Sequence, residues 1–213
     1  MTAIREAYLD AAATAAGLLG DPAVAGAWDA PSALPEFRVS GLAGHLARQI
    51  TIVPRLLAMA EPDGMPVITL MAHYARATWI GAGVDADVNV STRRGGEEEA
   101  AGGCAALTAL AHATVGRLRG TLPAEPAGRL VPVPWGPWVL SLDDFLTTRL
   151  LEIAVHSDDL AVSVGVPTPP LDPPALDPVL ALLTRLAVRR HGQAAVLRAL
   201  SRAERAPATI AAI

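Results

Sequence analysis

The pattern of hydrophobic and polar positions is clearest between Ser141 and Gly165, where it predicts one long helix. Ser141 is a suitable N-cap, and Gly165 is suitable as the residue that ends the helix. At about 100° per residue, apolar side chains flank a mostly polar stripe at the middle of the arc expected to be buried. The stripe consists of Phe145, Arg149, Glu152, His156 and Asp159. Because unpaired buried charges are costly, we expect these groups to have partners inside the protein.

The same periodicity assigns the other faces of this helix. Two apolar flanks are expected to be buried, namely Leu146, Leu150, Ile153 and Leu160 on one side and Leu151, Val155 and Val162 on the other. The opposite face is expected to meet solvent, and it holds Asp143, Thr147, Ala154, Asp158 and Ala161. The polar stripe is therefore the feature of this helix that needs a chemical explanation.

A metal ion is the simplest explanation. Glu152 and His156 are four positions apart, so they project from one helix face and can reach the same cation. The third ligand has to come from elsewhere, and the candidate is His45 in SGLAGHLARQI. Two other interpretations stay open: such a Glu–His pair is usually an ordinary surface pair, and a lone histidine on an apolar face is usually a hydrogen-bonded core residue.

Helical periodicity recurs along the rest of the chain. It predicts helices over residues 2–19, 40–59, 67–80 and 105–119, and two closing helices over 178–190 and 193–205. We expect Ser40 to cap the second helix and Pro54 to kink or shorten it. The glycine-rich segment 81–103 is expected to be a loop that re-enters a helix near Glu97, and the proline-rich run before Ser141 is expected to be extended.

These elements predict an all-α protein. Residues 1–165 would form a four-helix bundle of the up-and-down type, and residues 166–213 would add a proline-rich connector and C-terminal helices packed on the bundle. Hydrophobic residues make up 52% of the sequence, which is ample material for a core.

Charge and composition narrow the possible partners. The formal net charge is −4 and no long basic cluster occurs, which argues against nucleic acid as a partner. We find no signal peptide and no apolar stretch typical of a membrane span, so we expect a soluble cytoplasmic protein that does not bind membranes. The single cysteine, Cys104, excludes an intramolecular disulfide framework.

Several motifs together resemble a known family. They are the loop with Trp28, VSGLAGHLA with His45, WGPW, and RLLEIAVHSDDLA with Glu152, His156 and Asp159. In this order they resemble the metal-binding domain of the mycothiol-dependent maleylpyruvate isomerase family, a branch of the DinB-like bundles, over about residues 1–165. The resemblance implies a divalent ion, usually zinc, held by His45, Glu152 and His156, and an actinobacterial source.

The resemblance also implies a function. Members of the family use the thiol mycothiol, whose thiolate adds to an unsaturated diacid before rotation and elimination give the trans isomer; related members transfer the thiol. We therefore expect an isomerase or S-transferase that takes a small thiol and an electrophilic or unsaturated acid, with a homodimer as one possible assembly. The 48 residues after Gly165 are too few for the separate α/β domain of the isomerase.

Two residues of the stripe are candidates for catalytic roles. Arg149 is expected to pair with Glu152 or to bind an anionic thiol or a substrate carboxylate, with a plain buried ion pair as the alternative. Asp159 is expected to support His156, with a helix-end charge as the alternative.

A non-catalytic metal-binding protein of the stress or regulatory type is the competing function. The fourth coordination position of the metal separates the two functions. An open position beside Arg149 would favour catalysis, whereas closure by Gln49 or His73 would favour a structural site.

Overall fold

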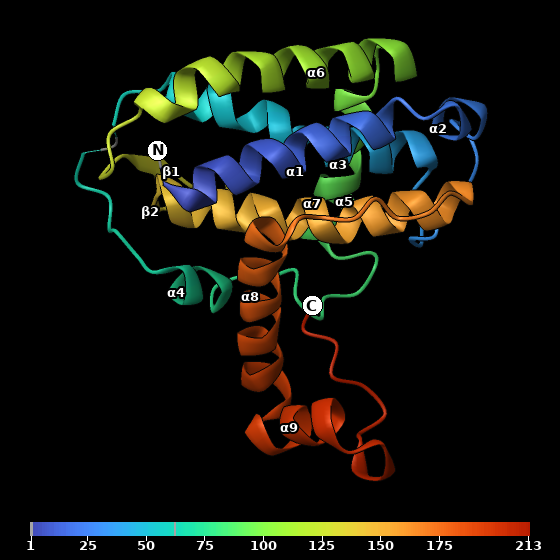
Figure 1. The fold of residues 1–213 in the computed structure, drawn as a ribbon, viewed down its shortest axis with the longest axis vertical. Helices are drawn as coiled ribbons and strands as arrows, with labels where there is room; N and C mark the ends of the chain where they lie inside the picture. The colour runs from blue at the N-terminus through green and yellow to red at the C-terminus, as the bar shows by residue number, and fades with distance from the viewer. Residues whose placement is uncertain (1, 62) are drawn as a thin grey trace.

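The computed structural model describes residues 2–61 and 63–213, and helices make up 64% of it (Figure 1). The α-helices are α1 (Ala3–Leu19), α2 (Pro22–Gly26), α3 (Val39–Leu57), α4 (Leu70–Tyr74), α5 (Asp87–Glu99), α6 (Cys104–Thr121), α7 (Leu142–Val164), α8 (Pro173–His191) and α9 (Gln193–Ser201). Short 3-10 helices span Leu122–Ala124 and Ala203–Arg205, and strands β1 (Leu130–Pro132) and β2 (Val139–Ser141) form an antiparallel hairpin. The prediction of an all-α protein is confirmed in its broad form.

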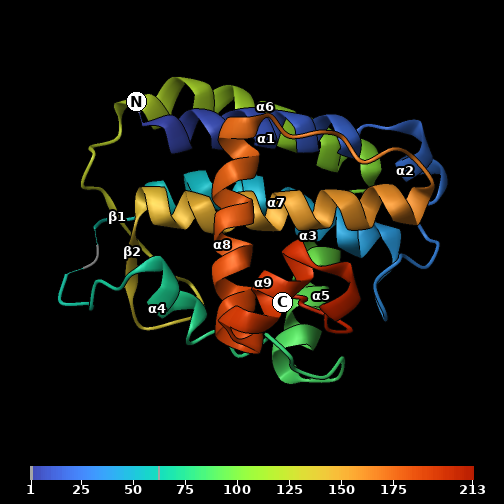
Figure 2. The same cartoon turned by 60° about the horizontal axis from the view of Figure 1, so that its bottom comes forward.

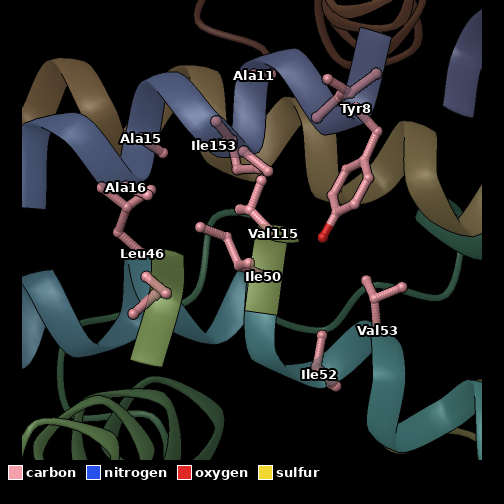
Figure 3. Packing of buried hydrophobic residues seen from close by; sticks show 14 of the residues in the cluster. Tyr8, Ala11, Ala15, Ala16, Leu46, Ile50, Ile52, Val53, Val115 and Ile153 are labelled. Atoms are coloured by element: carbon pink, nitrogen blue, oxygen red, sulfur yellow. The ribbon is translucent and has the colours of Figure 1, made fainter. Parts of the chain in front are cut away.

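The core lies between α1, α3, α6 and α7. Helix α1 packs against α3, α6 and α7, and α3 packs against α6 and α7. Small residues of α1 lie over larger side chains of α3, as Figure 3 shows for Ala15, Ala16, Leu46 and Ile50. Among the helices in the described part of the chain, none is long and apolar enough to cross a bilayer.

Helix α7 begins and ends where the sequence predicts. The Ser141 hydroxyl accepts the N–H of Asp144 at 3.1 Å, and Gly165 ends the helix with φ of 72°, a conformation that glycine adopts at little cost. One face differs from the expectation: Ala161 is buried, whereas Val162 is 61% exposed. The reason is that α1 and α8 pack against α7, so the side expected to meet solvent is partly covered.

Helix α3 starts before the expected cap and passes through its proline. It begins at Val39, and the N–H groups of Val39 and Ser40 donate to carbonyls of the preceding loop at 2.9 Å each, so no side-chain cap is needed. Pro54 lies inside the helix, which runs on to Leu57. Arg129 donates to the carbonyl of Leu57 at 3.1 Å and so supports the last turn.

Helix α5 shows that the expectation of a loop was wrong for residues 87–96, whereas Glu97 lies in a helix as expected. Packing on α3 explains the helix in spite of two adjacent glycines, which have poor helix propensity. A Cβ on Gly96 would overlap the carbonyl oxygen of Gly41, and a Cβ on Gly44 would overlap that of Gly96. The two helix backbones therefore approach each other closely, and only glycine allows this contact.

The helix expected over 67–80 is also wrong, because only α4 forms there. The N–H of Ile68 donates to the carbonyl of Val139 at 3.1 Å, so the start of the segment pairs with β2 instead of coiling. Thr69 then caps α4, since its hydroxyl accepts the N–H of Ala72 at 3.2 Å. Strand pairing with a distant segment overrides the local helical pattern.

Helix α8 leaves the core crosswise to α7, and α9 follows it (Figures 1 and 2). Helix α8 starts at Pro173, earlier than the predicted 178, and α9 ends at Ser201 before a short 3-10 turn. The last residues return toward the core, where Ala212 is buried and Ile210 and Ile213 pack in a second apolar cluster with Tyr74 and Leu151. This return brings the C-terminal segment beside the candidate site.

Candidate metal centre

His45, Glu152 and His156 converge between α3 and α7. Nε2 of His45 lies 3.4 Å from Oε2 of Glu152, and Nε2 of His156 lies 3.3 Å from the same oxygen. One ligand atom from each residue lies within 4.8 Å of the other two. The two imidazole rings meet edge to face, with centroids 4.7 Å apart. The residues that the sequence places on two separate helices thus present three donor atoms to one point.

The electrostatics of the cluster favour an ionised Glu152. Burial by itself would raise the pKa of Glu152, but hydrogen bonds from His156 and His45 and the charge of Arg149 hold it well below its usual value. Burial lowers the pKa of His45. Burial also acts to lower the pKa of His156, but the carboxylates of Asp159 and Glu152 raise it to about 9. The cluster therefore contains negative charge that a cation or a proton has to balance.

Asp159 lies one turn beyond His156 and contacts its other ring nitrogen. Oδ2 of Asp159 is 2.9 Å from Nδ1 of His156. A carboxylate at this position accepts the Nδ1 proton and leaves the lone pair of Nε2 for a metal. Asp159 thus contacts His156 and is not one of the three residues whose donor atoms converge.

Arg149 has no carboxylate within ion-pair distance in the described residues, so the expected pair with Glu152 does not form. Its side chain is nearly buried, at 6% exposure. One guanidinium nitrogen donates to Oε1 of Gln49, and Nε donates to the hydroxyl of Thr148 at 3.0 Å. The guanidinium carbon lies 5.1 Å from the ring centroids of both Trp135 and Phe145. A buried cation with such neutral partners is suited to receive an anion.

Gln49 and His73, the side chains considered for closing a metal site, each have a possible ligand atom occupied by another side chain. Oε1 of Gln49 accepts from Arg149, while its Nε2 donates to the carbonyl of His45 at 2.7 Å and lies 3.4 Å from Nε2 of the same histidine. Nδ1 of His73 accepts the indole N–H of Trp138 at 3.1 Å.

The three converging residues lie at the wall of a pocket of about 800 Å³. The pocket wall also includes Arg48, Arg76 and Arg149, and Glu152 is the acidic residue among the lining groups. Aromatic rings line another part of it, from Phe37, Tyr74, Trp79, Trp135 and Trp138. A cavity with this excess of positive charge favours anionic ligands of small-molecule size.

Sequence reasoning missed three of these features. It considered Gln49 and His73 only for closing a metal site, and it gave Trp135 and Trp138 no role in binding. The available signal was the buried stripe itself, within which Glu152 was the partner considered for Arg149. The partner of Arg149 comes from α3, which local periodicity does not reveal.

Comparison with known protein families matches the part of the chain that contains the three converging residues. The family model described as Mycothiol maleylpyruvate isomerase N-terminal domain matches residues 8–161. The matched residues include His45, Glu152, His156 and Asp159. No curated protein and no solved structure matches the chain.

Proposed function

Because the chain belongs to the mycothiol maleylpyruvate isomerase N-terminal domain family, we propose that it is a metal- and thiol-dependent isomerase or S-transferase. In this proposal His45, Glu152 and His156 hold a divalent cation, most simply Zn²⁺, and the pocket beside them receives a low-molecular-weight thiol such as mycothiol together with an unsaturated or electrophilic acid. The helices α1, α3, α6 and α7 then correspond to the up-and-down bundle of DinB-like proteins.

The convergence of the three donor atoms carries the proposal. Two imidazole nitrogens and one carboxylate oxygen are a donor set that suits zinc, and their mutual distances of at most 4.8 Å fit around a single ion. The contact between Asp159 and His156 supplies the orienting carboxylate that histidine ligands commonly have. The residues present therefore fit the cation that the family implies.

Three protein ligands and an adjoining pocket favour catalysis over a structural site. Structural zinc has four protein ligands, whereas catalytic zinc keeps a position for water or a reactant. The engagement of Gln49 by Arg149 and of His73 by Trp138 supports an open fourth position. A cation held there would lower the pKa of a thiol that reaches it and so favour the thiolate near neutral pH.

The side chains of the pocket would bind and orient the acid. Arg149 is nearly buried and lines the pocket together with Glu152. It would hold a carboxylate of the substrate while the thiolate forms a C–S bond at the double bond. Rotation about the resulting single bond and cleavage of the C–S bond then give the trans isomer and return the thiol.

The test is metal and thiol binding by purified protein and its variants. Elemental analysis of the tag-free chain should give about one equivalent of zinc, and His156→Ala and Glu152→Ala should lose it while far-ultraviolet circular dichroism stays helical. His112→Ala is the matched control, because His112 is exposed on α6.

Thiol activation is tested on protein loaded with Co²⁺. Addition of mycothiol should produce a sulfur-to-cobalt charge-transfer absorption band, and turnover of a cis-unsaturated diacid should require both metal and thiol. Metal retained by His156→Ala would disprove the ligand set. Stoichiometric metal with no thiol band and no turnover would instead support the non-catalytic alternative.

A further inference from the structure

His73 occupies a position in the pocket that the metal cluster does not explain. It lies in the last turn of α4, is 5% exposed and lines the same pocket as Glu152 and Arg149. It is not one of the three residues whose donor atoms converge. Because His73 is buried in this pocket, its possible role depends on which ring nitrogen carries the proton and on what that N–H group faces.

Trp138 determines the tautomer of His73. The indole N–H is a donor only, and it lies 3.1 Å from Nδ1 of His73, so Nδ1 has to accept. The neutral ring then carries its proton on Nε2. Trp138 is itself held in place, because its ring lies directly against Gly136, where a Cβ would overlap it. The position of the proton is therefore set by the WGPW turn.

The Nε2–H group of His73 is free to donate to a ligand in the pocket. Within residues 2–61 and 63–213, Nε2 has no hydrogen-bond partner, and it is not one of the polar atoms sealed from solvent. The ring stays neutral near neutral pH, since burial and the charge of Arg149 lower its pKa to about 4. His73 is thus a directed neutral donor and not a base.

Arg149 and His73 both lie close to the indole ring of Trp135. The Trp135 ring centroid lies 6.3 Å from that of His73 and 5.1 Å from the guanidinium carbon of Arg149. From this arrangement we propose that His73 is a second substrate-binding residue, whose Nε2–H donates to an oxygen of the anionic substrate while Arg149 binds its carboxylate. This inference rests on the proposed function for the identity of the site and adds the group that fixes the orientation of the acid.

A neutral donor suits an oxygen whose charge changes during the reaction. When a thiolate adds to a double bond conjugated with a carbonyl, negative charge develops on the carbonyl oxygen. A preorganised N–H donor binds that oxygen more strongly as the charge grows. No proton is transferred in this role: the low pKa keeps the ring from taking up a second proton, and a neutral imidazole does not give up its remaining N–H proton near neutral pH.

The first experiment tests the tautomer and needs neither metal nor substrate. Long-range ¹H–¹⁵N correlation spectra of the labelled protein should show the Nε2–H form for His73, and Trp138→Phe should give a mixture of tautomers. His191, which lies near the carbonyl of Ala211, serves as an internal reference. An Nδ1–H form in the parent protein would overturn the inference.

The second experiment measures binding of maleate, a cis-unsaturated diacid, by calorimetry to zinc-loaded and zinc-free protein. His73→Phe should weaken binding by about tenfold or more, and His73→Gln, which keeps a donor, should restore most of it. Zinc content should be equal in all of these proteins. Equal maleate affinity in the parent and in His73→Phe, or no maleate binding by the zinc-loaded parent, would overturn the role of His73.

The two proposals fail in different ways. If the parent does not take up zinc, the proposed function fails, and maleate binding to the zinc-free protein still tests the donor role because Arg149 and His73 do not depend on the cation for their positions. If zinc binds as expected and only the maleate results are negative, the metal site stands and the inference about His73 is wrong.

Discussion

Asp159 holds His156 from the side opposite Glu152. Its Oδ2 lies 2.9 Å from Nδ1 of His156, while Nε2 of the same ring lies 3.3 Å from Oε2 of Glu152. The imidazole is thereby fixed in both position and rotation between two carboxylates. This orientation suits the ring to the ligand role proposed for it, and the first prediction follows from it.

Asp159→Asn should lower zinc affinity by about 10- to 100-fold, because the orienting carboxylate is lost while the ligands remain. Competition with a chromophoric chelator measures the affinity. Asp158→Asn is the matched control, since Asp158 is exposed and an asparagine oxygen can still accept from Thr168. Equal affinities for the two variants would contradict the orienting role.

His73 should make the fold less stable in acid. Its folded-state pKa of about 4 lies below the ordinary 6.5, so the unfolded chain takes up the proton first as pH falls. The stability contribution is therefore complete above pH 6.5 and is lost toward pH 4, by about 3 kcal/mol at most. Urea unfolding of metal-free protein across this window should show a smaller acid loss for His73→Gln than for the parent. His112→Gln should show the same loss of stability as the parent. If the free energy of unfolding of His73→Gln fell with pH as steeply as that of the parent, the lowered pKa of His73 would be refuted.

Gly96→Ala should destabilise the protein although alanine favours helices. A Cβ at Gly96 would overlap the backbone of Gly41, and overpacking of this kind costs about 1–3 kcal/mol. Gly116→Ala is the control, because Gly116 lies within α6 with open space around it, and there the substitution should stabilise by up to about 1 kcal/mol. Chemical denaturation of both variants gives the comparison; a gain in stability for Gly96→Ala would show that α3 and α5 are not in close contact.

Arg5→Met should destabilise the fold far more than loss of a surface ion pair. Arg5 is 2% exposed, and its guanidinium donates to Asp143 at 2.9 Å and to the carbonyls of Glu125 and Pro126 at 2.6 and 2.9 Å. Removing these donors should cost about 2–4 kcal/mol. The thermal midpoint should fall accordingly, without loss of zinc binding.

The control for Arg5 is Arg119→Met. Arg119 pairs with Asp10 at 3.0 Å, but both side chains are more than half exposed. Such pairs contribute less than about 1 kcal/mol. A similar loss of stability in the two variants would mean that the Arg5 network is not structural.

Helix α7 could be predicted because its signals are local. Ser141, the polar stripe and Gly165 all lie within one helix, and helical periodicity places Glu152 and His156 together without reference to the rest of the chain. His45 could be proposed as their companion from its apolar surroundings alone. The residues of the candidate centre were therefore accessible from the sequence, whereas their ligand role stays a prediction.

The missed elements depend on partners far along the chain. Helix α5 contains adjacent glycines that read as a loop until α3 presents Gly41 and Gly44 to them. Ile68 joins the hairpin because Val139 offers a carbonyl. The contact between Arg149 and Gln49 joins positions 100 residues apart. In each case a tertiary contact overrides or completes a local pattern.

The return of the C-terminal segment divides the pocket between two parts of the chain. The donor atoms come from α3 and α7, inside the matched residues 8–161, whereas Ile213 adds to the wall from beyond them. Changes in the C-terminal segment can therefore reshape the cavity without touching a single donor atom. Such a division would let substitutions near the C-terminus alter the choice of ligand while the three donor atoms stay constant.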